Sequence, residues 1–355
     1  MASSTVSNGG DAAGRLAEPS SPTRCIKCTA QRYPNAPRNL VVCIDGTSNK
    51  FGRNNTNIVK LFSKINLDPE RPLPQQRAYY SSGVGIRPKA WHVISRFQRS
   101  FSNLLDEAIA WNVEEIVHDA YYWLAREYRE GDQIYLFGFS RGAYQVRILA
   151  GMIYEVGLIK TVTDKQIGMA YENYMAVRSR KLHAKDIASD FKHTFCWEDM
   201  KVHFVGVWDT VSSVGLVKED VFLSSSSSAE HACYFRHALA LDEKRVKFMS
   251  EYFYEMNTKA GGNSKASKTS DVKEVWFAGS HSDVYSFHAG NVSLMWMRHE
   301  AAESGLILKP TDMVWTPADL ESGTSKSMSL AWKILELLPI KHQVSWCGPG
   351  ELVRK

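Results

Sequence analysis

The chain has 355 residues, 44% of them hydrophobic and 23% charged, with a formal net charge of +5 at pH 7. This composition predicts a globular protein with a substantial core, and so small a net charge for this length gives no indication of nucleic-acid binding. The apolar runs are shorter than the roughly 18 residues that span a bilayer, and the first two dozen residues have no apolar signal core. We therefore expect a cytoplasmic protein that binds no nucleic acid and contacts membranes only transiently, at their surface.

Residues 1–37 are rich in serine, alanine and glycine and predict a disordered N-terminal tail. Cys25 and Cys28 have the spacing of half a zinc site, but no second Cys or His pair accompanies them at a suitable distance. We favour a tail with two free thiols over a metal site. The six cysteines are scattered along the chain, which indicates a reducing compartment, and we expect neither a metal nor a cofactor.

The first predicted strand is the apolar run 39–44, which ends at the sequence Asp-Gly-Thr. Such a continuous run is typical of a strand buried on both faces of a parallel sheet. A second short strand is expected at 78–80, and apolar residues recur at helical spacing from 113 to 124. Between them, the basic amphipathic segment 87–101 has two interpretations: a lid helix packed on its own domain, which we favour, or a helix on an anionic membrane.

The segment from Gln133 to Ala143 combines a short apolar run, the pattern Gly-x-Ser-x-Gly and the start of a helix with an apolar face. This order predicts a nucleophile elbow, in which Ser140 occupies a strained turn between a strand and a helix. Gly138 and Gly142 leave room for that turn because they lack a Cβ atom. The alternative is an ordinary turn serine, but the strand–turn–helix context favours a nucleophile.

Strands and helices continue to alternate in the second half of the chain. A mostly helical insertion is expected at about 160–195, and a strand at 202–208 leads directly into Asp209. Another strand is expected at 274–278, with His281 just beyond its end. Functional side chains are therefore placed after strand ends, where loops at one edge of a parallel sheet line a crevice.

Polar low-complexity stretches predict loops at about 222–230 and 257–271. An amphipathic helix is expected at 330–338, where a proline ends it. We therefore predict a single domain over residues 38–340 and a C-terminal tail over 341–355. The expected fold class is α/β and α/β-hydrolase-like, with a mostly parallel central sheet flanked by helices and with helical insertions.

Ser140, Asp209 and His281 occur in the chain order expected of an α/β-hydrolase, and each follows a predicted strand. In that arrangement the serine attacks, the histidine accepts its proton and later returns it to the leaving group, and the aspartate fixes the imidazole tautomer. The alternative for Asp209 is a helix N-cap before Thr210. The histidines that compete with His281 are His203, His231, His237 and His288. His203 lies inside a strand, and we predict that His237 belongs to a packed helix.

An ester hydrolase also needs donors for the oxyanion. We expect the backbone N–H of Arg141 to provide one, and Thr47 or Ser48 the other. Asp45 is interpreted as a brace of the oxyanion loop, in preference to a Mg²⁺ or Ca²⁺ ligand that acts together with Asp283. Asp283 is also an alternative triad acid, although its closeness to the histidine in sequence makes that geometry awkward.

Seven ordered motifs extend well beyond the serine pattern. They are, in chain order, CIDGT (43–47), NTNI (55–58), YYSSGVG (79–85), GFSRGA (138–143), GVWDTV (206–211), RHALALDE (236–243) and SHSD (280–283). Together they resemble the uncharacterised α/β-hydrolase domain widespread in fungi, which is similar to the catalytic part of the first class of bacterial type VI secretion lipase effectors. The resemblance covers about residues 38–339. It implies a Ser–Asp–His esterase, and phospholipase A-type activity occurs among the bacterial relatives.

Two positions depart from the pattern of that family. Ser48 stands where an aromatic residue usually follows Asp-Gly-Thr, and Val284–Tyr285–Ser286 stands where a residue and a glycine pair are usual. Tyr285 and Asp283 are expected beside the substrate, where the tyrosine narrows the space. The predicted function is hydrolysis of lipid or acyl esters through an acyl-enzyme on Ser140. The alternatives are an acyltransferase on the same scaffold and an inactive hydrolase fold that serves as a binding module.

Overall fold

The computed structural model describes residues 38–46, 55–70, 74–82, 101–197, 200–211, 231–244, 270–285 and 288–311, with the backbone alone for 101–112, 285 and 288–290. Several predicted features lie outside these residues. They are the two tails, the basic segment up to residue 100, most of the two polar loops and the helix at 330–338.

A six-stranded sheet forms the centre of the described structure, and each pair of neighbouring strands in it is parallel. Its strands, in spatial order, are β2 (Gln76–Ser81), β1 (Asn39–Ile44), β3 (Gln133–Phe139), β6 (Val202–Trp208), β7 (Ala232–Ala240) and β8 (Asp271–Phe277). The predicted parallel α/β fold, of the α/β-hydrolase-like kind, is thus confirmed. Strands β4 (Leu158–Ile159) and β5 (Cys196–Trp197) form a separate antiparallel ribbon.

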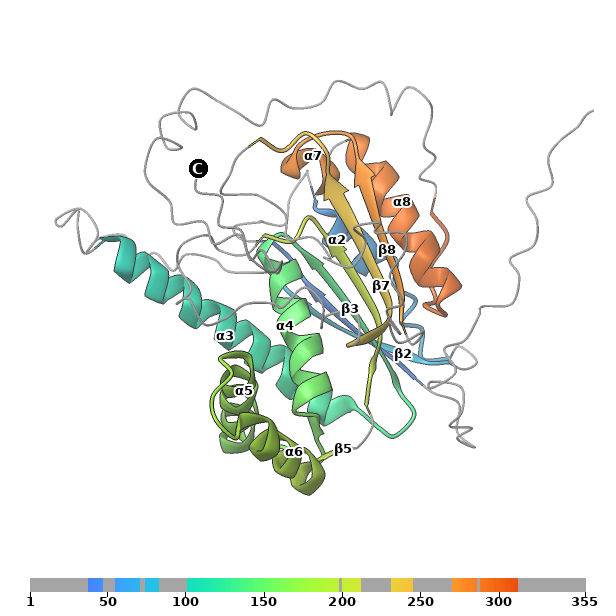
Figure 1. Ribbon diagram of the computed structural model, residues 1–355. Coiled ribbons are helices and arrows are strands. Elements are labelled where there is room, and N and C mark those ends of the chain that lie inside the picture. The colour runs from blue at the N-terminus through green and yellow to red at the C-terminus, as the bar shows by residue number, and fades with distance from the viewer. Residues whose placement is uncertain are drawn as a thin grey trace, which may run out of the picture.

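Helices cover both faces of the sheet (Figure 1). They are α2 (Asn57–Ser63), α3 (Phe101–Glu127), α4 (Arg141–Glu155), α5 (Asp164–Arg178), α6 (Ala184–Phe195), α7 (His281–Tyr285) and α8 (His288–Glu303). The predicted insertion at 160–195 consists of α5 and α6 with the short ribbon, and it lies beside the C-terminal half of α4 (Figure 1). In the described part of the chain, no helix combines the length and apolar character needed to cross a bilayer.

Two apolar cores lie on opposite faces of the sheet because successive strand residues point to opposite sides. In β1, Leu40, Val42 and Ile44 join the core under α3 and α4, whereas Val41 and Cys43 join the core under α2 and α8. All of these side chains are fully buried. Burial on both faces explains why the run at 39–44 is apolar throughout and why it could be predicted as a strand.

Our prediction for the segment around His237 was wrong: residues 232–240 form strand β7, not a packed helix. The strand pairs with β6 on one side and β8 on the other, and nearly all of its residues are buried. An alanine- and leucine-rich run buried on both faces has no two-residue periodicity, and by composition it is equally suited to a helix. Pairing with β6 and β8 makes this segment a strand.

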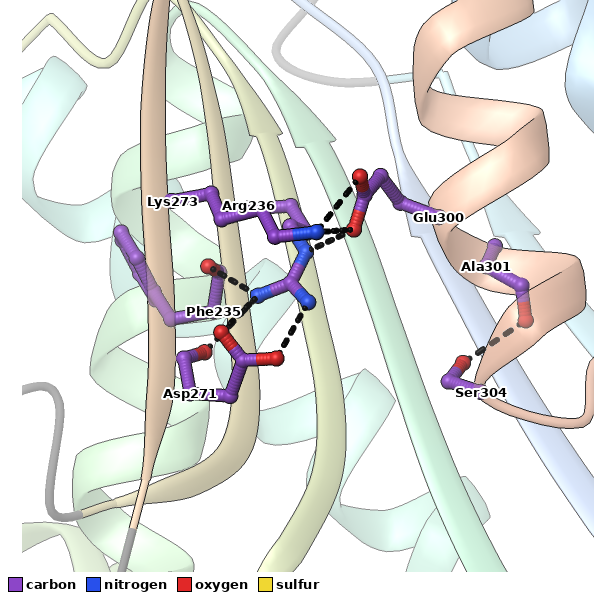
Figure 2. Close-up of polar contacts among 7 residues, drawn as sticks. All are labelled: Phe235, Arg236, Asp271, Lys273, Glu300, Ala301 and Ser304. Atoms are coloured by element: carbon purple, nitrogen blue, oxygen red, sulfur yellow. Dashed lines mark hydrogen bonds and ion pairs between the residues drawn. The ribbon is translucent and has the colours of Figure 1, made fainter. Parts of the chain in front are cut away.

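An ion network around the buried Arg236 joins β7 to β8 and α8 (Figure 2). Arg236 is 3% exposed and bonds Glu300 of α8 at 2.5 Å and Asp271 of β8 at 2.8 Å. Lys273 of β8 also contacts the Glu300 carboxylate, at 2.9 Å. Since a buried guanidinium is costly unless it is paired, the two carboxylates hold this face of β7 against β8 and α8. The next residue, His237, points to the opposite face.

Candidate active site

Ser140 lies between the end of β3 and the start of α4, as the predicted elbow requires. Its backbone has φ 56° and ψ −120°, in a region that residues with a side chain rarely adopt. Strand β6 holds the turn, since the Ser140 amide donates to the carbonyl oxygen of Trp208 at 3.0 Å. The Val211 amide donates to the Ser140 carbonyl at 3.3 Å. A strained, tightly held backbone of this kind fixes the direction in which the serine hydroxyl points.

The two glycines of the pattern have the close contacts that the sequence predicted. A Cβ atom on Gly138 would lie 2.5 Å from the carbonyl oxygen of Gly142. One on Gly142 would lie 2.3 Å from the carbonyl oxygen of Ile44, at the end of β1. No side chain fits at either position without a shift of the backbone, so the elbow requires glycine at both.

Asp209 follows β6 immediately and is completely buried. Its φ of 43° places it in the left-handed region, so this turn is also strained. Strand β7 holds it from the side: the Asp209 amide donates to Ala238 O at 2.8 Å, and the Ala240 amide donates to Asp209 Oδ1 at 3.1 Å. The second carboxylate oxygen, Oδ2, faces the histidine.

His281 is the first residue of α7 and is 5% exposed. Its ring stacks on Phe139, with the ring centroids 4.8 Å apart. The ring Nδ1 lies 2.5 Å from Asp209 Oδ2, and Nε2 lies 2.9 Å from Ser140 Oγ. The three predicted side chains, 141 residues apart at the extremes, therefore form one continuous chain of hydrogen bonds at the carboxyl end of the sheet.

The residues predicted to support an oxyanion are described only in part. Arg141 is the first residue of α4, so its backbone N–H has no acceptor within the helix and points out of the helix N-terminus. Burial lowers the pKa of the Arg141 guanidinium. Thr47 and Ser48 lie outside the described residues. Of the predicted donor residues, Arg141 lies in the described part of the chain, and its role as an oxyanion donor stays a prediction.

Asp45 is fully buried and accepts hydrogen bonds on both carboxylate oxygens. The Gly46 amide donates to Oδ1 at 2.7 Å, and the hydroxyls of Thr56 and Tyr80 donate to Oδ2 at 2.6 and 3.2 Å. Burial, together with the Asp45 carboxylate, raises the pKa of Tyr80. These bonds join the end of β1 to β2 and to the start of α2. The loop after Gly46 lies outside the described residues, so a brace of the oxyanion loop by Asp45 stays a prediction.

Asp283 is also buried, and its carboxylate serves its own loop. Oδ2 accepts the Ser280 amide at 2.8 Å and the Ser280 hydroxyl at 3.0 Å, which closes the turn that begins α7. The carboxylate in contact with the His281 ring is that of Asp209. The side chain of Tyr285 lies outside the described part of the structure, so its place beside a substrate stays a prediction, as does that of Asp283.

Three of the competing histidines have surroundings of their own. His203 donates from Nε2 to Ser304 O at 2.8 Å. The His231 ring packs at a tilt against the ring of Tyr154, and burial, reinforced by nearby cationic side chains, lowers the pKa of His231 to about 3. His237 contacts Thr210 and Glu274. None of them contacts Ser140 in the described structure, and the side chain of His288 is outside it.

Two acidic residues beside the site, Asp242 and Glu243, hold the loop of His281, a role that the sequence analysis did not predict. The Asp242 carboxylate accepts the Gly279 amide at 2.8 Å, and the Glu243 carboxylate accepts the His281 amide at 3.1 Å. Both follow the end of β7 and hold the loop that carries the histidine. Their place in the motif RHALALDE was the available signal, but the loop that they hold is nearly 40 residues away in sequence.

Among the described residues, no group of three or more His, Cys, Asp or Glu side chains is arranged to hold a metal ion. The polar groups of the site instead pair with one another, from carboxylate to imidazole to hydroxyl. Such a chain can remove a proton from the serine hydroxyl and hold the resulting positive charge on the imidazole beside a carboxylate.

The sequence of this chain is similar to a known family and to a yeast protein. A family model described as "T6SS, Phospholipase effector Tle1-like, catalytic domain" matches residues 38–300. The "Uncharacterized protein YEL023C" of Saccharomyces cerevisiae (strain ATCC 204508 / S288c) is 34% identical over 240 residues, which cover 63% of this chain. The match spans 34% of the yeast protein, so this chain corresponds to about a third of its length.

Two solved structures are more distantly similar. One is titled "Structure of the Tle1 effector bound to the VgrG spike from the Type 6 secretion system", with a TM-score of 0.39 and 16% identity over 71% of this chain and 51% of that chain. The other is an uncharacterized protein from Pseudomonas aeruginosa, with a TM-score of 0.43 and 15% identity over 85% and 50%. This chain thus spans about half the length of each.

Proposed function

The chain belongs to the family of Tle1-like phospholipase effector catalytic domains, and on that premise we propose that it is a serine hydrolase of lipid esters. In this proposal Ser140 is the nucleophile, His281 is the general base and then the general acid, and Asp209 orients the imidazole. The substrate is an acyl ester, and among lipids a phospholipid fits the name of the family best. The reaction needs no cofactor.

The observation that supports the proposal most strongly is the hydrogen-bond chain from Asp209 to His281 to Ser140. With its Nδ1 proton donated to Asp209, the imidazole has its lone pair on Nε2, 2.9 Å from the serine Oγ. Ser140 Oγ then attacks the ester carbonyl carbon while its proton moves to Nε2. The positive charge that forms on the ring lies beside a fully buried carboxylate, which stabilises it.

The acyl-enzyme then forms and is hydrolysed in two steps, and His281 Nε2 passes on one proton in each. The tetrahedral intermediate expels the alkoxide, which takes the proton from His281 Nε2 and leaves as an alcohol. A water molecule next gives a proton to the same nitrogen and attacks the acyl carbon, and Ser140 leaves with that proton. The Arg141 N–H at the start of α4 is the proposed oxyanion donor, and a single donor of this kind contributes about 10²–10³-fold in rate. A second donor from Thr47 or Ser48 stays a prediction.

Three expectations about the location and partners of the protein also stay predictions. They are contact with a membrane surface through the basic segment 87–101, a cytoplasmic location and the absence of a nucleic-acid partner. The Tle1 effector of the solved complex binds the VgrG spike. We propose no such partner for this chain.

Ester hydrolysis by purified wild type and Ser140→Ala tests the proposal directly. We expect wild type to hydrolyse short p-nitrophenyl esters and diacyl phosphatidylcholine vesicles, and we expect Ser140→Ala to lose at least 10³-fold in kcat while it remains folded. Ser179→Ala, at the C-cap of α5, serves as the matched control with wild-type rates. Diether phosphatidylcholine, which has no ester carbonyl, should remain intact.

The same assays separate the alternatives. If supplied glycerol diverts most of the acyl group into a new ester, the protein is an acyltransferase on this scaffold. If folded wild type hydrolyses no ester and does not react with a fluorophosphonate, the proposal is wrong and the fold serves as a binding module. Activity that survives Ser140→Ala would contradict the mechanism itself.

A further inference from the structure

A second pair of histidine and carboxylate lies next to the first. His237 of β7 is completely buried, and its Nδ1 lies 2.9 Å from Oε1 of Glu274 on the neighbouring strand β8. Its other nitrogen, Nε2, accepts the backbone N–H of Thr210 at 3.2 Å and lies 3.2 Å from the Thr210 hydroxyl oxygen. Glu274, His237 and Thr210 therefore repeat, one strand further along the sheet, the order of carboxylate, imidazole and hydroxyl residue.

The Thr210 contact determines where the proton of this imidazole lies. A backbone N–H always donates, so Nε2 must present its lone pair. The proton of the neutral ring is then on Nδ1, from which it is donated to Glu274. Because the ring is buried between a fixed donor and a fixed acceptor, one tautomer satisfies both contacts.

The position of Thr210 gives this contact its significance. Thr210 follows Asp209, whose left-handed backbone, with φ 43°, must be held by its surroundings. Strand β7 contacts the turn at three points: Ala238 O accepts the Asp209 amide, the Ala240 amide donates to the carboxylate, and His237 accepts the next amide. Of these three contacts, the one through the imidazole is made by a side chain of β7, and the other two are made by its backbone. The imidazole holds the amide of Thr210, the residue that leaves the turn.

We propose that His237 is a positioning residue for Asp209: with its tautomer fixed by Glu274, it holds the Thr210 amide and thereby the direction of the Asp209 carboxylate. The inference rests on the proposed function, since positioning matters for rate when Asp209 orients His281. Displacement of a catalytic group by about 1 Å costs on the order of 10²-fold in rate. Loss of the Thr210 contact should therefore lower kcat and leave the substrate-binding surface unchanged.

The ion network on the other face of β7 does not serve this turn. Arg236, adjacent to His237, points toward Glu300 of α8 (Figure 2). The ion pairs of Arg236 with Asp271 and Glu300, and of Lys273 with Glu300, join β7, β8 and α8. On one face of β7, Arg236 binds side chains of β8 and α8, and on the other face His237 contacts the turn that contains Asp209.

Two amide substitutions separate the contacts of the ring. In His237→Gln the amide reaches the position of Nε2, so its oxygen can accept the Thr210 N–H. In His237→Asn the shorter amide reaches the position of Nδ1 and keeps the Glu274 contact, but it leaves Thr210 without its acceptor. Both variants are neutral and of similar polarity. We expect kcat per folded molecule to fall about 10²-fold in His237→Asn and less than about tenfold in His237→Gln, with KM within about twofold in both.

The same pair of substitutions at His203 is the control. His203 is a buried strand histidine on β6, 3% exposed, whose Nε2 donates to Ser304 O. His203→Asn and His203→Gln should lower stability and leave kcat per folded molecule unchanged. Folded fractions are measured by thermal unfolding, so that a loss of native protein is not counted as a loss of rate.

Equal kcat values for His237→Asn and His237→Gln, or values equal to wild type, would overturn the positioning role while the proposed function stands. NMR of protein labelled with ¹⁵N-histidine provides a readout that needs no turnover. We expect the Nδ1–H tautomer at His237 in wild type. We also expect the low-field proton between His281 and Asp209 to be lost in His237→Asn and kept in His237→Gln. An Nε2–H tautomer, or a low-field proton unaffected in both variants, refutes the inference even if wild type is inactive.

Discussion

Replacing Asp209 with asparagine tests the orientation of the imidazole. The two oxygens of this carboxylate have different partners: Oδ1 accepts the Ala240 amide at 3.1 Å, and Oδ2 faces His281 Nδ1 at 2.5 Å. In Asp209→Asn the amide oxygen stays opposite the Ala240 N–H, because an NH₂ group there would place two donors face to face. The NH₂ group is then directed at His281.

An NH₂ group opposite Nδ1 reverses the tautomer of the imidazole. Nδ1 becomes the acceptor, Nε2 carries the proton, and the nitrogen opposite Ser140 Oγ no longer has a lone pair for the serine proton. The wrong tautomer of such a triad lowers kcat about 10⁴-fold. At about 1.4 kcal/mol per tenfold, this loss corresponds to about 5.5 kcal/mol of transition-state stabilisation.

The assay is p-nitrophenyl ester hydrolysis at pH 7.5, with the folded fraction of each variant determined by thermal unfolding. Asp271→Asn is the control, because this aspartate pairs with Arg236 at the start of β8 and is 49% exposed. Its kcat should remain within about twofold of wild type. If folded Asp209→Asn retained more than a tenth of the wild-type kcat, the argument from tautomer and hydrogen-bond geometry would be wrong.

Three further predictions concern packing, positioning and pH. Gly142→Ala forces a Cβ to within 2.3 Å of a backbone oxygen and should lower the free energy of unfolding by about 3 kcal/mol. Gly168→Ala, in open space on α5, is the control and should raise the free energy of unfolding by about 0.5–1 kcal/mol. A Gly142→Ala variant as stable as wild type would contradict the close packing of the elbow. Glu243→Ala removes the acceptor of the His281 amide and should lower kcat about tenfold, with Glu243→Gln close to wild type; equal rates in both would exclude this positioning. Burial lowers the pKa of His231 from 6.5 to about 3, so the unfolded chain takes up a proton that the folded protein does not. Stability should therefore be full above pH 6.5 and fall toward pH 3 by up to about 1.4 kcal/mol per pH unit, and His231→Phe should flatten this slope in urea unfolding; an unchanged slope would show that the histidine is not its source.

The elements that could be predicted from sequence are those with a strong local pattern. The run at 39–44 and the run before Ser140 are buried strands, and both are continuous apolar stretches bounded by turn residues. The glycines beside Ser140 indicated a turn that tolerates no side chain, which the close approach of Gly142 to β1 explains. Chain order and strand ends then selected Asp209 and His281 among several acids and histidines, because parallel strands bring their carboxyl ends to one edge.

The features that could not be predicted depend on which strands are neighbours. The segment around His237 has a composition that suits a helix, and its pairing between β6 and β8 made it a strand. The contact between His237 and Thr210 exists because β6 and β7 pair in register, and no local pattern encodes that register. The same holds for Glu243, whose partner is the amide of a residue 38 positions later in the chain.

Active-site labelling tests the central claim most directly. Wild-type protein is incubated with a fluorophosphonate, its intact mass is measured, and the modified peptide is sequenced by tandem mass spectrometry. The account predicts one adduct per molecule, on Ser140, which is absent in Ser140→Ala and forms far more slowly in Asp209→Asn. An unmodified but folded wild-type protein, or an adduct on another residue, would contradict it.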